Sequence, residues 1–475
     1  MNSVLLGNGI NIQFGGLAYN SDFIMKRIKY ASRLGKYDCL FGNKLTGTEI
    51  ERMFNDFVPL ANDIRLKNYD KYAGDNKDLK EALVDFQGRY NCEIKAVHEI
   101  MLEDWFLIIR MFFEKNMDLE EERSATIQGF EQLILDAIYN DGKIQELYKK
   151  MNKKVRKFFS SFDNIFSLNY DNNIENLTRK PVYHLHGDFS VLANSENSSN
   201  VQGYIRQKKG ETVWLPEMKH CFCNALLNYS GKLKYKTATD AHALIADSET
   251  YAARYMYDEN FREGVERLQE ENPVYYELIM TKIQHPELNM ATEYYFDTFK
   301  NITGKLSIIG MSPNNDDHIF DIILNNPNLK KVTFFYYSEK ERRYVEDNFP
   351  SELFMCESVH KLWEDLNSKR PEYKCNYNIP NKAKDIINAL NILSDDEIDF
   401  KRIKEEINKV PKFEVERLCR AVKEDMMIRN PTHSSTDSKG FIQGNASISY
   451  IALQEGILPS VLYLMCVMNF EYIQD

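Results

Sequence analysis

Two histidines, His184 and His186, stand one residue apart in the stretch "PVYHLHGDF" (residues 181–189), in a chain that has nine histidines. A neutral imidazole accepts protons near neutral pH. The alternating apolar pattern predicts a strand, which would point both rings to one face. Gly187 then permits a sharp turn. We therefore predict that His186 faces a ligand site, while His184 supports it; the alternative is a pair of satisfied core histidines.

A second polar group follows another apolar run, "FSLNYDNNIENL" (residues 166–177). Asn169 carries both a donor and an acceptor and could fix a ribose or a water molecule. Asp171 follows two residues later. The alternative is ordinary turn chemistry, because Asn and Asp commonly cap helices.

Two glycine-containing turns complete the set. "SVLLGNG" contains Gly7 and Gly9, and "LSIIGMSPNNDDHI" contains Gly310 and Ser312. Glycines after a strand let the backbone approach a pyrophosphate, and the following helix offers unpaired N–H groups. Plain strand–turn–helix connections are the alternative, with residues 314–317 capping the helix that follows.

The elements that would position these residues alternate between strands and helices, which predicts an α/β fold with a parallel, doubly wound sheet. Residues from about 20 to 155 look mostly helical and form an insertion after the first strand. Residues 367–382 resemble a linker, and helical patterns follow it to the C-terminus. We therefore divide the chain into residues 1–365 and a C-terminal helical region, 366–475.

Composition limits the classes of function. The 475 residues carry a formal net charge of -11, which disfavours a direct nucleic-acid partner. The sequence shows no signal peptide and no run of 18 apolar residues, so we expect a cytoplasmic protein with no membrane contact. The eight cysteines form no CxxC pair.

Taken in order, Gly-x-Gly, Asn-x-Asp, His-Gly and Gly-x-Ser, each after an apolar strand, resemble the sirtuin (Sir2-like) family. The resemblance is closest to the large bacterial Sir2-like proteins linked to phage defence, and it covers residues 1–365. It implies a Rossmann-like NAD-binding core with a helical insertion. It also implies catalytic roles for His186 and Asn169, and cofactor-binding roles for Gly7, Gly9, Asn11, Asp171, Gly310 and Ser312.

The missing zinc cysteines refine the implied activity. Deacylating sirtuins hold a structural zinc with two CxxC pairs, whereas "HCFC" (residues 220–223) has the wrong spacing. We therefore expect no metal, and cleavage of the nicotinamide–ribose bond of NAD to nicotinamide and ADP-ribose. The resemblance further implies an abortive-infection effector, a homo-oligomer and a phage-derived activator or a partner defence protein.

Three other interpretations stay open. The "GNG" opening also looks like the AbiH family of abortive-infection proteins, which carries a His-Gly motif. A sensor that binds NAD or ADP-ribose without turnover would use the same residues. A protein deacylase fits less well, because the zinc cysteines are missing.

Overall fold

The computed structural model describes residues 1–33, 35–42, 44–190, 215–370, 412–429 and 445–457, together with Leu462, Met465 and Cys466. Its centre is a six-stranded, all-parallel sheet with the order β3-β2-β1-β4-β5-β6. The strands are β1 (Asn2–Leu6), β2 (Asn164–Ser167), β3 (Tyr183–His184), β4 (Gly304–Ile309), β5 (Leu329–Tyr336) and β6 (Phe354–Ser358). The predicted α/β fold with a Rossmann-like sheet is confirmed.

Strand residues alternate between two hydrophobic cores because successive side chains of a strand point to opposite faces. Val4 and Leu6 belong to the core shared with the helical insertion, whereas Leu5 belongs to the core on the other face. In β1 these three side chains are fully buried. Central parallel strands are covered on both faces, which explains why they read as continuous apolar runs.

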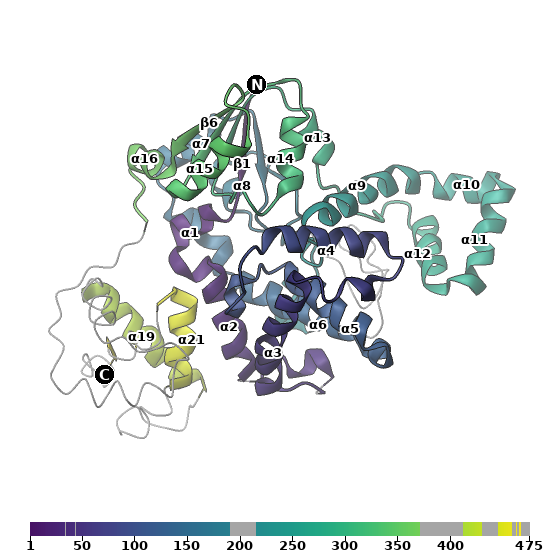
Figure 1. Ribbon diagram of the computed structural model, residues 1–475, viewed down its shortest axis with the longest axis horizontal. Helices are drawn as coiled ribbons and strands as arrows, with labels where there is room; N and C mark the ends of the chain where they lie inside the picture. The colour runs from purple at the N-terminus through teal and green to yellow at the C-terminus, as the bar shows by residue number, and fades with distance from the viewer. Residues whose placement is uncertain are drawn as a thin grey trace.

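Helices cover the sheet and join its strands (Figure 1). Those attached directly to strands are α1 (Gly9–Gly15), α7 (Lys153–Ser160), α8 (Asn173–Thr178), α13 (Phe296–Lys300), α14 (Asp317–Leu324), α15 (Glu339–Asn348) and α16 (Val359–Asp365). The predicted alternation of strands and helices is confirmed, for example in β5–α15 and β6–α16.

The helical insertion lies between α1 and β2, next to the sheet (Figure 1). Its α-helices are α2 (Ser21–Arg33), α3 (Gly47–Arg65), α4 (Lys77–Arg89), α5 (Asp104–Lys115) and α6 (Glu120–Tyr139). Short 3-10 segments connect them: η1 (Gly16–Tyr19), η2 (Asp38–Phe41), η3 (Asp70–Ala73), η4 (Val97–Glu99), η5 (Met117–Leu119) and η6 (Lys143–Lys150).

A second helical insertion lies between β3 and β4. It contains η8 (Pro216–Cys221), α9 (Gly231–Ser248), α10 (Tyr251–Tyr257), α11 (Glu259–Glu271) and α12 (Pro273–Gln284). The last three project away from the body of the molecule (Figure 1). They enclose a small core of their own around Tyr251, Val265 and Ile279.

Two C-terminal helices, α19 (Lys412–Arg429) and α21 (Asn445–Glu455), pack against each other and, through α21, against α2. The buried Arg27 guanidinium donates to the Leu453 carbonyl at 3.1 Å and so ties α21 to α2. The helical patterns predicted after the linker thus include two described helices, α19 and α21, while those predicted before residue 412 lie outside the described residues.

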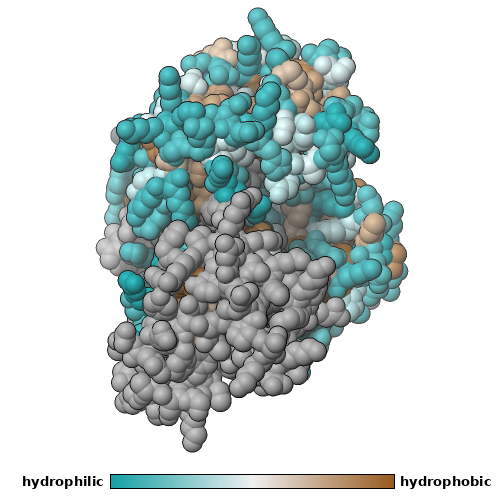
Figure 2. Space-filling view, turned by 90° about the vertical axis from the view of Figure 1, so that its left-hand side faces the viewer, coloured by the Kyte–Doolittle hydropathy of each residue, from teal (hydrophilic) through white to brown (hydrophobic). Residues whose placement is uncertain are grey.

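On the face drawn in Figure 2, the described surface is mostly hydrophilic, with small apolar patches. None of the described helices combines the length and the apolar run that crossing a bilayer requires.

Candidate functional site

One cavity of about 590 Å³ opens along the carboxyl ends of the strands. This is the edge where ligands bind in open α/β sheets, and the volume lies within the range of small-molecule sites. Residues following all six strands line it: Gly7, Asn8 and Gly9 after β1, Asn169 and Tyr170 after β2, His186 after β3, Gly310, Ser312, Asn315 and Asp316 after β4, Tyr337 and Glu341 after β5, and Trp363 after β6. Residues predicted from distant motifs thus share one cavity.

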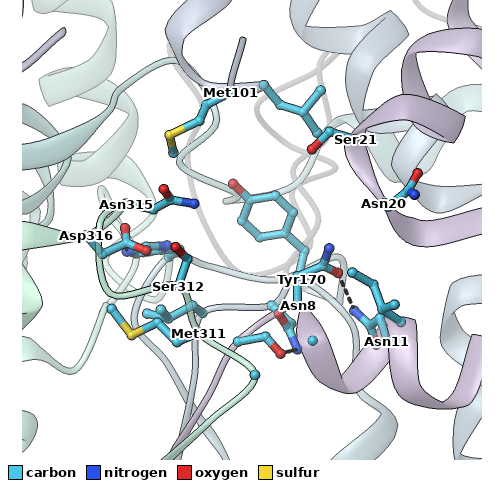
Figure 3. Close-up of a pocket in the computed structure, with 18 of the residues that line it drawn as sticks. Asn8, Asn11, Asn20, Ser21, Met101, Tyr170, Met311, Ser312, Asn315 and Asp316 are labelled. Atoms are coloured by element: carbon cyan, nitrogen blue, oxygen red, sulfur yellow. Dashed lines mark hydrogen bonds and ion pairs between the residues drawn. The ribbon is translucent and has the colours of Figure 1, made fainter. Parts of the chain in front are cut away.

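The Tyr170 side chain stands within this cavity (Figure 3), with Asn315 and Asp316 on one side and Asn11 and Asn20 on the other. Its hydroxyl is buried and has no hydrogen-bond partner within the described residues. Burial raises the pKa of Tyr170 well above its ordinary value, so the phenol stays neutral and able to donate.

Close packing of two turns explains why glycines stand at positions 7, 9 and 310. A Cβ on Gly7 would lie 2.5 Å from the Gly310 oxygen, and one on Gly9 would lie 2.6 Å from the Gly310 Cα. The Gly7 and Gly9 amides donate to the carbonyls of Ile309 and Gly310, at 2.9 and 2.8 Å. The glycines therefore let two turns meet at the floor of the cavity, rather than directing their own N–H groups at a ligand.

The N-terminus of α1 also differs from the prediction of unpaired N–H groups. The Ile10 amide donates to the Gly7 carbonyl at 3.1 Å, and the Ile12 amide donates to the Asn8 carbonyl at 3.1 Å. Little of this helix end is left for an anion. The turn offers a ligand the backbone of Gly7, Gly9 and Gly310, which line the cavity and carry no side chains of their own.

His184 and His186 do not share a strand face, so that prediction is wrong. Strand β3 ends at His184, and the chain turns at Leu185 and His186. His184 lies between the Glu175 carboxylate, 2.5 Å from its Nε2, and the Asn169 carbonyl, 2.8 Å from its Nδ1. Burial lowers the pKa of His184, but the hydrogen bond and charge of Glu175 outweigh it and raise the pKa to about 9.

His184 is therefore a charged support for the loop that carries Asn169. The Asn169 amide nitrogen donates to the Gly7 carbonyl at 3.1 Å, which fixes this side chain against the β1 turn. Within the described residues it makes no other side-chain hydrogen bond, so one N–H and the amide oxygen are available to a ligand.

His186 has the opposite environment. It is 3% exposed, lines the cavity, and its Nε2 has no hydrogen-bond partner within the described part of the chain. Burial, followed by the charges of Lys234 and His318, holds the pKa of His186 well below its ordinary value. The ring is neutral, and Nε2 can accept a proton from a molecule in the cavity.

Asp171 does not line the cavity, in contrast to its predicted cofactor-binding role. It is buried and accepts hydrogen bonds from the Asn11 side chain at 2.8 Å and from the Asn173 side chain at 2.5 Å. Asn11 does line the cavity, and its buried Oδ1 has no partner among the described residues. Asp171 thus orients Asn11 and acts on a ligand only through it.

The residues after β4 are not simple helix caps. Asp316 occupies the N-cap position of α14, but its side chain makes no capping hydrogen bond. Instead the carboxylate faces the cavity, and its Oδ1 lies 4.0 Å from His186 Nε2. Burial raises the pKa of Asp316 to about 6, although the nearby Lys234 opposes the shift. The capping interpretation of this acidic residue is therefore wrong.

Sequence reasoning missed the part of the cavity wall that the insertions supply. Lys234 on α9 is buried, and its Nζ lies 3.1 Å from the Glu103 carboxylate, which immediately precedes α5. Both residues line the cavity. Neither stands in a recognisable motif, because helix packing rather than local spacing brings them together.

The far end of the cavity is aromatic and charged. Trp363 on α16, Tyr337 and Glu341 near the start of α15, and Arg370 line it. An Arg370 side-chain nitrogen lies 3.3 Å from the Tyr337 hydroxyl. Such a mixture suits a flat, hydrogen-bonding base stacked near a sugar.

Of the eight predicted site residues, seven line this cavity and Asp171 alone does not. Comparison with family models, curated proteins and solved structures finds no match to this chain. The six-stranded parallel sheet is therefore the part of the Sir2-like resemblance that is shown.

Proposed function

We propose that this chain is an NAD hydrolase that cleaves the bond between nicotinamide and ribose C1′. The observation that carries the proposal is the meeting of Gly7, Gly9, Asn169, His186 and Gly310 around one cavity. These residues come from motifs up to three hundred positions apart, and their order in the chain is that of Sir2-like proteins. A role as an abortive-infection effector rests on the motif resemblance alone.

The shape of the cavity supports a dinucleotide. It extends from His186 after β3 to Trp363 after β6, and so passes the central glycine turns. The pyrophosphate would lie beside Gly7, Gly9 and Gly310, which line the middle of the cavity. The nicotinamide riboside would lie toward His186, and the adenine toward Tyr337 and Trp363.

The chemistry needs little from the leaving group, because nicotinamide departs as a neutral molecule. The C1′–N bond breaks with its electron pair going to nicotinamide, which leaves oxocarbenium-like charge on the ribose. A water oxygen then bonds to C1′. His186 Nε2 accepts the proton that this water releases, a contribution worth about 10²–10⁴-fold in rate.

The remaining side chains orient the reactants. Asn169, fixed by its bond to the Gly7 carbonyl, would hold the ribose hydroxyls or the water. The neutral Tyr170 hydroxyl would donate to the same part of the ligand. His184 and Asp171 act from behind, by holding Asn169 and Asn11 in place.

Nicotinamide release from NAD by purified, metal-free protein tests the proposal. The wild type should release nicotinamide and ADP-ribose, while His186→Gln and Asn169→Ala should be strongly impaired. His285→Gln is the matched control, because His285 follows the C-terminal end of α12, is partly exposed and does not line the cavity. Release at the wild-type rate by both site variants would contradict the assignment.

The same experiment separates a sensor from an enzyme. Tight NAD binding without nicotinamide release, also when a candidate phage activator is added, would favour a nucleotide sensor. Release of nicotinamide only in the presence of an acetylated peptide would favour a deacylase.

A further inference from the structure

Three potential metal ligands meet at one side of the cavity. His186, Asp316 and His318 each offer one ligand atom, and these atoms all lie within 4.8 Å of one another. His186 follows β3, whereas Asp316 and His318 flank the first residue of α14. The cluster therefore joins two strand ends that are far apart in sequence.

Three of the imidazole nitrogens in this cluster lack hydrogen-bond partners within the described residues. Both nitrogens of His318, and Nε2 of His186, are buried and make no hydrogen bond with any described residue. His318 is 2% exposed and His186 is 3% exposed. Burying an unpaired polar group costs stability, so three such atoms on neighbouring rings indicate that a ligand occupies the space between them.

We propose that His186, Asp316 and His318 bind a divalent transition-metal ion, with Zn²⁺ as the best fit. Two imidazole nitrogens and one carboxylate oxygen form a borderline-soft ligand set, which suits Zn²⁺ and its neighbours better than Mg²⁺ or Ca²⁺. The expectation of no metal rested on the missing CxxC pairs. A search for closely spaced cysteines does not detect His186, Asp316 and His318, because these ligands come from separate segments.

The geometry is close to what zinc requires. Bonds of about 2.0–2.2 Å place the ligands of a tetrahedral zinc roughly 3.2–3.6 Å apart. His186 Nε2 and Asp316 Oδ1 are 4.0 Å apart, and all three ligand atoms lie within 4.8 Å of one another, so side-chain rotations that shorten these separations by about 1 Å complete the coordination. Three protein ligands with one side facing the cavity also leave a position open for water or an anionic ligand, as in catalytic and regulatory zinc sites.

The surrounding charges permit a cation. Two cations act on the cluster, Lys234 and Arg89, and each is paired with a carboxylate: Lys234 with Glu103 at 3.1 Å, and Arg89 with Asp104 at 2.6 Å. These carboxylates offset part of the positive charge, and the Asp316 carboxylate supplies negative charge within the cluster.

Metal binding would also regulate the cavity, a consequence that rests on the proposed function. A lone pair on His186 Nε2 cannot bind Zn²⁺ and accept a proton at the same time. Bound Zn²⁺ should therefore inhibit NAD cleavage. The metal site itself does not depend on any activity.

Isothermal titration calorimetry tests the site directly: Zn²⁺ is titrated into the full chain after a chelator has removed any bound metal. The wild type should bind one Zn²⁺ with a Kd below about 10 µM. His318→Phe should preserve the aromatic contacts that His318 makes with Tyr235 and Phe296, yet bind Zn²⁺ at least about 100-fold more weakly. Asp316→Asn should weaken binding similarly, and His285→Gln should not.

Circular dichroism establishes that each variant is folded before it is titrated. A wild type without a saturable one-to-one site, or a folded His318→Phe protein that binds as tightly as the wild type, would overturn the proposal.

Nicotinamide release measured with and without Zn²⁺ then tests the regulatory step: Zn²⁺ should inhibit the wild type and should inhibit His318→Phe much less. If Zn²⁺ binds but no nicotinamide is released under any condition, the metal site stands and the proposed hydrolase falls.

Discussion

Two buried polar regions of this molecule differ in whether their groups are satisfied. Around Asp136 on α6, the carboxylate lies 2.6 Å from Lys36 Nζ, 2.8 Å from the Tyr37 hydroxyl and 3.1 Å from His220 Nε2. Burial opposes ionisation, but His220 and then Lys36 outweigh it and lower the pKa of Asp136 to about 2. This region is a closed structural network that joins the helical insertion to η8 of the second insertion.

The strand-end cavity is the open counterpart. Asn11 Oδ1, the Tyr170 hydroxyl and His186 Nε2 are all buried, and none has a partner within the described residues. Backbone hydrogen bonds fix the segments that carry two of them: the Phe189 amide donates to the Tyr170 carbonyl, and the Leu226 amide donates to the His186 carbonyl. Buried polar groups cost stability unless they are paired, so a cluster of unpaired ones at a ligand-binding edge indicates function, whereas the paired cluster indicates stability.

The largest expected effect comes from the open region. His186→Gln should reduce nicotinamide release by about 10²–10⁴-fold, because the general base is lost. Its melting temperature should change little, since Nε2 makes no bond that the substitution breaks. His220→Gln is the contrasting variant: it should lower the melting temperature and leave turnover by the folded protein close to the wild-type value. A reversal of these two outcomes would break the comparison.

The closed region should respond in stability alone. Asp136→Ala leaves the Lys36 ammonium and the buried Tyr37 hydroxyl without their acceptor, and should lower the free energy of unfolding by about 3 kcal/mol. Urea denaturation measures this loss. Asp56→Ala, which removes only an exposed pair with Arg52, should cost less than about 0.5 kcal/mol. Equal losses in the two variants would mean that the network around Asp136 is not structural.

A smaller effect is expected at Asn11. Asn11→Ala removes an acceptor at the cavity and should raise the KM for NAD about 5–10-fold, with kcat nearly unchanged. Asn62→Ala is a suitable control, because the Asn62 amide is bonded to the Ile94 backbone inside the helical insertion. It should affect stability without changing KM. An unchanged KM for the Asn11 variant would place the ligand elsewhere.

The smallest effect is a pH dependence. The pKa of Asp136 is depressed in the folded state, so its stabilisation is complete above the unfolded-state value near 4 and is lost as the pH falls toward 2. The stability difference between wild type and Asp136→Asn should therefore shrink by about 1 kcal/mol between pH 5 and pH 3. A difference that grows on acidification would show that the carboxylate is not held ionised.

Much of this arrangement could be predicted from the chain itself. Apolar runs ending in Gly7, Asn169 and Gly310 predicted strands of one parallel sheet, and the carboxyl ends of such strands share an edge. The sequence could not predict that His184 is paired behind the cavity while His186 lines it. This difference depends on where β3 stops pairing with β2. A one-residue difference in that end point decides which ring faces the cavity.

Other features depend on packing between distant segments. Lys234 and Glu103 approach across two insertions, and no local pattern encodes that contact. From the sequence, Asp316 was interpreted as a helix cap because it immediately precedes a helix. Capping is the commoner role of an Asp at that position. Only the absence of a capping bond and the nearby His186 distinguish it.

The most direct test of the central claim is a crystal structure of the His186→Gln protein soaked with NAD. The account predicts that the pyrophosphate lies over Gly7 and Gly9, and that ribose C1′ lies within about 4 Å of the residue 186 side chain, a reactive separation. NAD bound outside this cavity, or bound in it with the adenine beside residue 186, would contradict the account.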